Sequence, residues 1–186
     1  MKRFFPLLLI LFILAGCSSR KDDMGRALRF RENLLQQSGC AFHCNLTAEY
    51  GQIIYQFVLD CQVDNKGDVS FTVTAPDSIS GIKGVLSGSG GQIKFDDSIL
   101  GFPILSEELP TPLSAPWLFM NAMRSGYIRA CDVRDGKMAL TIAETYEENA
   151  MHMKMQFDRK DKPVSCEIIW KDRRVLSMEI DDFHYL

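Results

Sequence analysis

The residues best able to do chemistry lie in one short run, Cys40-Ala41-Phe42-His43-Cys44, which offers two thiols and an imidazole. These are ligand types that zinc prefers. The alternation of apolar and polar residues around them is typical of a strand, and in a strand His43 points away from the face that holds both cysteines. Cys40 and Cys44 would then lie about 13 Å apart at roughly 3.3 Å per residue, so they can neither chelate one ion nor bridge each other. We therefore expect no metal site and no other cofactor.

Cys61 lies on the next predicted strand and is the candidate partner for a disulfide. A two-residue turn at Tyr50-Gly51 puts Cys40 opposite Cys61, whereas a four-residue turn over residues 51–54 puts Cys44 there. Both registers keep the apolar faces of the two strands together. The sequence thus predicts a disulfide from Cys61 to Cys40 or to Cys44 and leaves the choice open.

Three histidines and four carboxylate pairs are the other groups able to act as general acids or bases. His43, His152 and His184 are each surrounded by alternating residues, and no serine lies in the pattern of a nucleophile elbow. The carboxylates cluster at predicted turns or strand ends, where solvation accounts for them: Asp96-Asp97, Glu107-Glu108, Glu147-Glu148 and Asp181-Asp182. We therefore expect that the chain is not an enzyme.

The amino-terminal residues have the charge and length of a secretory signal. Met1-Lys2-Arg3 is a short positive region, and an apolar run over residues 4–14, broken only by Pro6, is too short to span a bilayer. The run closes on Leu14-Ala15-Gly16-Cys17, which resembles the lipobox of bacterial lipoproteins. That resemblance implies cleavage after Gly16 and acyl chains on Cys17, which would anchor the protein firmly to a membrane.

Removal of residues 1–16 leaves 170 residues, enough for a single domain with a real core. We expect a short polar tether over residues 17–23 and one domain over residues 24–186. The signal removes two basic residues, so the formal net charge changes from −3 to −5, and nucleic acid is not an expected partner. Five cysteines remain after Cys17, an odd number, so at least one thiol should stay unpaired.

The elements that would position these residues are mostly strands. Apolar residues at helical spacing predict a helix over residues 24–37, ended by Gly39, and after it the period changes from helical to two. The alternation predicts a large antiparallel sheet, with strands at residues 42–50, 55–63, 69–75, 82–86, 92–95, 127–133, 138–143, 151–157, 164–170 and 176–180. The fold class is mainly β, of the α+β type.

Four prolines within residues 103–116 predict a long loop or lid. Ser114 can cap a short helix that begins near Pro116 and ends at Gly126. That helix is apolar almost all round, so it should be buried against the sheet.

A methionine-rich strand suggests where a ligand would bind, because methionine side chains adapt to irregular apolar surfaces. With the central helix it would line an acyl-chain cavity of eight residues: Trp117, Phe119, Met120, Met123, Met151, Met153, Met155 and Phe157. The alternative is a closed core in which the same residues pack on one another, and the sequence does not separate a filled barrel from a hollow one.

The order of these elements resembles the LolA/LolB family of periplasmic lipoprotein carriers. The residues that carry the resemblance are the run Pro76-Asp77-Ser78-Ile79-Ser80-Gly81 and the hairpin that leads to Gly90-Gly91-Gln92-Ile93-Lys94-Phe95. The resemblance implies an open half-barrel whose concave apolar face is covered by helices and takes up acyl chains. The lipid anchor is a feature of the LolB branch.

The sequence therefore leaves two alternative functions open. The first is a lipoprotein, anchored on the outer side of the cell membrane or on the outer membrane, that binds an acyl chain or lipoprotein lipid in its half-barrel. The second is an envelope interaction module in a Gram-positive or spore-forming bacterium. Such a module would use a sheet edge or the outer face of the sheet to hold or regulate a partner such as a cell-wall hydrolase.

Overall fold

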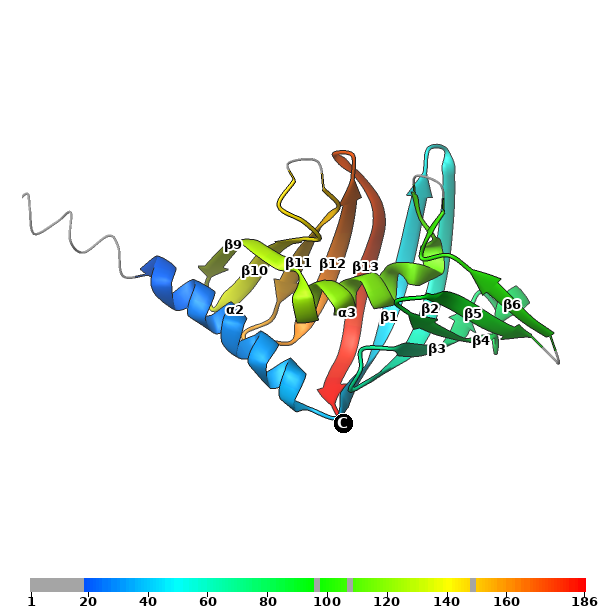
Figure 1. Ribbon diagram of the computed structural model, residues 1–186, viewed down its shortest axis with the longest axis horizontal. Helices are drawn as coiled ribbons and strands as arrows, with labels where there is room; N and C mark the ends of the chain where they lie inside the picture. The colour runs from blue at the N-terminus through cyan, green and yellow to red at the C-terminus, as the bar shows by residue number, and fades with distance from the viewer. Residues whose placement is uncertain (1–18, 96–97, 107–108, 148–149) are drawn as a thin grey trace, which may run out of the picture.

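The computed structural model describes residues 19–95, 98–106, 109–147 and 150–186. Most of these residues form one antiparallel sheet of eleven strands, in the order β6-β5-β4-β3-β2-β1-β13-β12-β11-β10-β9. The sheet stays open, because its edge strands β6 and β9 do not pair with each other. Two helices lie across one face of it (Figure 1). The fold predicted from the sequence, a large open antiparallel sheet with helices over one face, is confirmed.

The first half of the chain contains one helix, the strands of one side of the sheet and a separate two-stranded ladder. In order these are α2 (Ser19–Gln36), β1 (Gly39–Tyr50), β2 (Ile53–Asp64), β3 (Val69–Ala75), β4 (Lys83–Ser87), β5 (Gly90–Phe95), β6 (Ser98–Phe102), β7 (Leu105–Ser106) and β8 (Leu109–Pro110). The second half supplies α3 (Ala115–Ser125), β9 (Tyr127–Arg134), β10 (Lys137–Ala143), β11 (His152–Phe157), β12 (Pro163–Trp170) and β13 (Arg173–Tyr185). Short 3₁₀ turns at Asp77–Ile79 and Pro112–Ser114 precede β4 and α3.

Helix α2 begins at Ser19, five residues before the predicted start, so most of the predicted tether is helical. Its buried side chains are Ala27, Phe30 and Leu34, which are spaced three and four residues apart and therefore form one stripe. The Phe30 ring packs edge-on against Phe157 of β11, with 5.0 Å between ring centroids. Helix α2 therefore covers the part of the sheet formed by β9 to β11.

Helix α3 follows the predicted proline segment and is buried, as its apolar composition indicated. Seven of its eleven residues are buried. Ser114 precedes the helix, but its hydroxyl donates to the carbonyl oxygen of Thr111 at 2.6 Å, so the predicted side-chain cap is wrong. Gly126 follows the last helical residue at a place where only glycine fits, because a Cβ atom there would lie 2.5 Å from Ile142 Cγ2 and 2.8 Å from the carbonyl oxygen of Ala122.

Alternation along the strands divides the sheet into two faces. The inner face, which the helices cover, is apolar and holds Phe42, Cys61 and Phe71 directly across from one another on β1, β2 and β3. The outer face carries the residues between them, such as His43 on β1 and Asp60 on β2. Each side chain's face therefore follows from the pairing register.

Strands β4, β5 and β6, here called the wing, extend from one side of the molecule at the end away from α2 (Figure 1). Gly84 on β4 is required where the ring of Phe71 crosses the strand, because a Cβ atom would lie 2.4 Å from Phe71 Cζ. Strand β6 was not predicted. The run Ser98–Phe102 is too short and too evenly apolar to give a clear period of two.

Candidate functional site

The eight residues predicted to line an acyl-chain cavity do come together on the inner face, within one hydrophobic core. They are, however, packed tightly. Met151, Met153, Met155 and Phe157 are between 1 and 3% exposed, and the three predicted residues of α3 that follow Trp117 are no more exposed than 1%. Trp117 is the exception, because it is half-buried at the margin of the core near Gly88.

Arg31 of α2 holds α3 in its place over the sheet. Its Nε donates to the carbonyl oxygen of Met123 at 2.7 Å, and its Nη2 donates to those of Gly126 at 2.8 Å and Ala122 at 3.3 Å. These carbonyl groups belong to the carboxyl end of α3, where a positive charge is favoured. Burial lowers the pKa of Arg31 from the ordinary arginine value. The two helices are thus joined as one cover over the packed inner face.

A large open space lies on the other side of the sheet. It is a groove of about 910 Å³ that runs over the outer faces of β13, β1, β2 and β3 onto the wing. We call it the outer groove. Its lining includes His43, Asp60, Thr72, Lys83 and Lys94. These five residues form one continuous row, because each lies directly across from the next in the pairing register.

The outer groove has opposite charge character at its two ends. At one end His43 Nδ1 lies 2.7 Å from Asp60 Oδ1, and Asp182 and His184 line the same end. At the other end Lys83 lies directly across from Lys94. Like charges in this arrangement repel each other.

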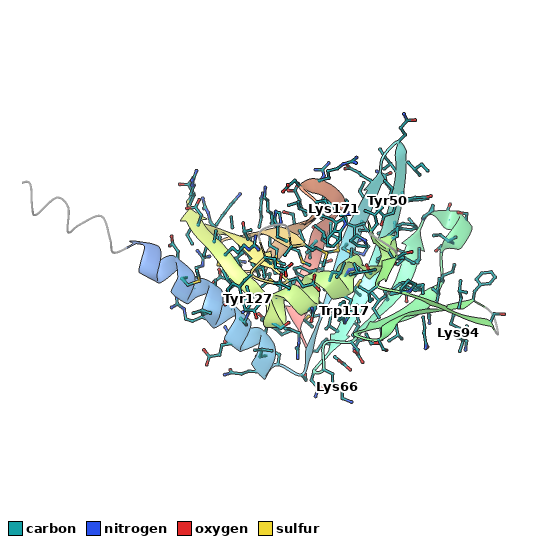
Figure 2. All side chains as sticks on the ribbon, turned by 45° about the horizontal axis from the view of Figure 1, so that its top comes forward. Tyr50, Lys66, Lys94, Trp117, Tyr127 and Lys171 are labelled. Atoms are coloured by element: carbon teal, nitrogen blue, oxygen red, sulfur yellow. The ribbon has the colours of Figure 1, made fainter. Side chains whose placement is uncertain are left out.

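The wing lysines also lack the neutralisation seen elsewhere on the outer face. On β13, Arg174 forms ion pairs with Glu49 of β1 at 2.6 Å and with Glu167 of β12 at 3.3 Å. Within the part of the chain that the structure describes, neither Lys83 nor Lys94 has an ion pair. Among the described residues, the wing end of the groove therefore carries positive charge. Figure 2 labels Lys94 on the wing, at the far side of the molecule from Tyr127 on β9.

The cysteines lie in a register that the sequence did not predict. Cys61 pairs with Phe42, so neither Cys40 nor Cys44 lies directly across from it, and both predicted registers are wrong by two residues. The hairpin turns at residues 51–52 rather than at Tyr50-Gly51 or over residues 51–54. As predicted, His43 faces away from both cysteines. All five cysteines of the described residues are free thiols.

Four of these thiols are buried, those of Cys40, Cys44, Cys61 and Cys166. A hydrogen bond with Cys44 and burial together raise the pKa of Cys61, while burial raises the pKa of Cys40 to about 12. Burial likewise raises the pKa of Cys166. Cys131 on β9 is half-exposed, and its thiol donates to the carbonyl oxygen of Asp23 at 3.1 Å. The buried thiols therefore behave as apolar core residues.

The other two histidines bond to the backbone near themselves. His152 Nδ1 lies 3.4 Å from the carbonyl oxygen of Ala150, and His184 Nδ1 lies 2.7 Å from that of Asp182. In the described ranges, no three side chains of histidine, cysteine, aspartate or glutamate gather as metal ligands would. The predicted carboxylate pairs at residues 96–97 and 107–108 lie outside the described residues, as does Glu148.

Sequence reasoning did not identify the outer groove. Alternation alone assigns Asp60, Thr72, Lys83 and Lys94 to solvent-facing positions, which is the usual place for such residues. The row forms only because four successive registers align, and a register cannot be read from one strand's pattern. One part of the groove could have been predicted. A two-residue turn at Gly88-Ser89 pairs Ser87 with Gly90, and counting outward from that pair places Lys83 on β4 directly across from Lys94 on β5.

Residues 1–18 match the family described as the prokaryotic membrane lipoprotein lipid attachment site. The chain is therefore a lipoprotein held on a membrane through its lipidated cysteine, as its lipobox indicated. Cys17 itself lies outside the described residues. Among the described residues, neither helix is long and apolar enough to cross a bilayer. The sequence matches none of the curated proteins with which it was compared.

The solved structures similar to this chain include three of bacterial proteins. An uncharacterized conserved protein from Thermus thermophilus is 9% identical, with a TM-score of 0.49 over 88% of this chain and 87% of that one. A LolA superfamily protein from Nitrosomonas europaea is 8% identical, with a TM-score of 0.46 over 84% and 92%. A structure of the CwlD amidase from Clostridioides difficile in complex with the GerS lipoprotein matches with 12% sequence identity and a TM-score of 0.46. The match covers 88% of this chain and 95% of that one. At these identities the function has to be argued from this chain's own residues.

Proposed function

We propose that this lipoprotein is a non-enzymatic binding module on the extracytoplasmic face of the membrane, which holds a protein partner in the outer groove. The observation that carries the proposal is the contrast between the two faces of the sheet. The inner face is filled by side chains at most a few per cent exposed, whereas the outer face carries an open groove of about 910 Å³. An envelope protein such as a cell-wall hydrolase is the class of partner that this location offers.

The charges along the outer groove favour a polypeptide over a small ligand. Acidic groups at the end formed by β13, β1 and β2 are followed on the wing by Lys83 and Lys94, which have no ion pair among the described residues. Exposed apolar side chains, Val85 at 47% and Ile99 at 68%, lie beside the lysines. A segment that presents acidic and apolar side chains to the wing, and a basic side chain at the other end, complements this pattern.

Uptake of an acyl chain on the inner face is the second candidate. The observation that favours it is the methionine content of the cluster there, in which Met120, Met123, Met151, Met153 and Met155 all take part. Methionine side chains rearrange more readily than branched ones. Because these residues are already packed, an acyl chain would have to displace α3 from the sheet.

Site-specific photo-crosslinking separates the two candidates. A photoreactive amino acid at Thr72, on the outer groove, should form one discrete protein adduct in intact membranes. Thr141 lies on the outer face of β10, outside the groove, and is the matched control position. The adduct should disappear when Lys83 and Lys94 are both replaced by glutamate, at an unchanged melting temperature.

The same preparation tests the second candidate. Native mass spectrometry of the mature protein should detect no co-purified lipid beyond the acyl chains on Cys17. Retained lipid, together with equal crosslinking from Thr72 and Thr141, would contradict the proposed protein partner and support the acyl-chain carrier.

A further inference from the structure

Strand β6 is an edge strand without the usual protection against pairing with another chain. Edges of natural sheets commonly carry charged residues or proline, or are covered by a helix. The opposite edge, β9, carries Arg129, Asp132 and Arg134 and is packed against α2. In contrast, β6 is Ser98-Ile99-Leu100-Gly101-Phe102, with no charge, and its Ile99 and Leu100 are 68% and 65% exposed.

The backbone groups available on β6 follow from the pairing of the wing. The β4–β5 hairpin pairs from Ser87 and Gly90 outward, and β5 pairs with β6 from Phe95 and Ser98. Hydrogen-bonded pairs alternate along antiparallel strands and begin at the pair that closes a two-residue turn. Ser98, Leu100 and Phe102 therefore bond to β5. The N–H and C=O groups of Ile99 and Gly101 face the open edge.

We infer that β6 pairs with β6 of a second copy of this chain, antiparallel and with Leu100 opposite Leu100 of the partner subunit. This register places Ile99 opposite Gly101 of the partner subunit, and the two-fold axis repeats that contact. Both residues present their free backbone groups to each other, so four hydrogen bonds form between the two strands. The interface is isologous, as a closed dimer requires.

Side-chain shapes match in this register. A Cβ atom at Gly101 would meet only the carbonyl oxygen of Gly91, 4.0 Å away, so the space over Gly101 is open. The exposed Ile99 of the opposite copy fills that space on the outer face. On the inner face, the two Leu100 side chains cover each other at a closely spaced, non-hydrogen-bonded pair.

The neighbouring registers are worse. A register centred on Gly101 puts Ile99 opposite Pro103, which has no N–H group to donate. A register centred on Ile99 puts two bulky side chains opposite each other and leaves the space over Gly101 unfilled. With Leu100 at the centre, Ile99, which pairs with Lys94 in its own copy, lies opposite Gly101 of the partner subunit. That glycine pairs in turn with Gln92 of the partner subunit, so the lysines of the two copies do not lie opposite each other. This dimer does not depend on the function proposed for the outer groove.

Disulfide trapping in membranes that carry the mature, acylated protein tests the register. Leu100→Cys places two thiols opposite each other at a Cα separation of about 4.5 Å, which is within the range a disulfide spans. Ile99→Cys is the matched control, since its two copies lie roughly 8 Å apart along the diagonal, beyond that range. Mild oxidation should convert most of the Leu100→Cys chain to a species of twice the mass. The Ile99→Cys and unmodified chains should stay single.

A second measurement keeps the inference testable without crosslinking. Sedimentation of the acylated protein in detergent should give a dimer for the unmodified chain and a monomer for Leu100→Lys, which sets two like charges opposite each other. Both positions are largely exposed in one copy, so the variants should fold. A monomer for the unmodified chain, equal trapping at positions 99 and 100, or an adduct between Leu100→Cys and a different protein would each overturn the dimer.

Discussion

The Nε of Arg31 lies 2.7 Å from the carbonyl oxygen of Met123, across the junction of the two helices. This contact joins helix α2 to a backbone group of α3 that lies 92 residues later in the sequence. Because α3 covers the centre of the sheet and α2 covers the β9 to β11 end, their mutual position determines how the inner face is filled. A single guanidinium group thus couples the two parts of the cover.

Replacing this guanidinium should destabilise the fold. Arg31→Ala removes the guanidinium donor from three carbonyl oxygens at the end of α3, of which that of Ala122 still accepts from the Gly126 N–H, and we expect a loss of about 1 to 3 kcal/mol in the free energy of unfolding. Arg31→Lys, which keeps the charge but not the planar fork, should lose less. Urea unfolding measures both, with Asn33→Ala, an exposed change on the same helix, as the control. An equal stability for Arg31→Ala and Asn33→Ala would contradict the coupling.

Met153→Gln tests whether the inner face is a packed core. Met153 is 3% exposed, so the substitution buries an amide without assured partners and should cost on the order of 1 to 3 kcal/mol of stability. Lys154→Gln, the exposed neighbour on the opposite face, should change stability little. Thermal unfolding and binding of a fluorescent fatty acid are the two readouts. An unchanged melting temperature with weakened fatty-acid binding would support the acyl-chain carrier instead.

Thiol labelling should distinguish Cys131 from the other cysteines. Cys131 is half-exposed, and burial raises its pKa to about 11, so maleimide should label it slowly near neutral pH and faster as the pH rises towards 11. Cys40, Cys44, Cys61 and Cys166 are buried and should react only after unfolding. Peptide mapping without reduction measures the labelling of all five cysteines.

The same maps test the disulfide predicted from the sequence. In the observed register Cys61 is hydrogen-bonded with Cys44, which makes Cys44 the better placed of its two candidate partners. A peptide that joins Cys61 to Cys44 or Cys40 would confirm that prediction, and Cys61 recovered as a free thiol would refute it.

Cys17→Ala should release the protein from the membrane. Neither helix in the described ranges is long and apolar enough to cross a bilayer, and the lipid attachment site lies within residues 1–18. Fractionation and acyl labelling check this, with Cys131→Ala as the control that keeps both attachment and label. Acyl labelling that persists in Cys17→Ala would contradict the position of the anchor.

The sequence predicted the layers of this fold better than their details. Alternation gave the fold class, and the apolar segment around Trp117 gave a buried helix, because both signals come from burial within one element. The β1–β2 register was wrong because two turn lengths satisfied the same apolar pattern, and strand β6 was missed because its run is evenly apolar. The outer groove depends on side chains from seven strands, a relationship that no local pattern contains.

The early start of α2 has a mechanical consequence. Only residue 18 separates the lipidated Cys17 from the first helical residue, Ser19. Two residues of extended chain reach at most about 7 Å. The anchor is therefore a pivot at one end of the protein and not a long flexible linker. The wing lies at the other end of the long axis (Figure 1). A small tilt about that pivot moves the wing through a wide arc, so the height at which the outer groove meets a partner is set by the angle of the whole protein and not by the length of its linker.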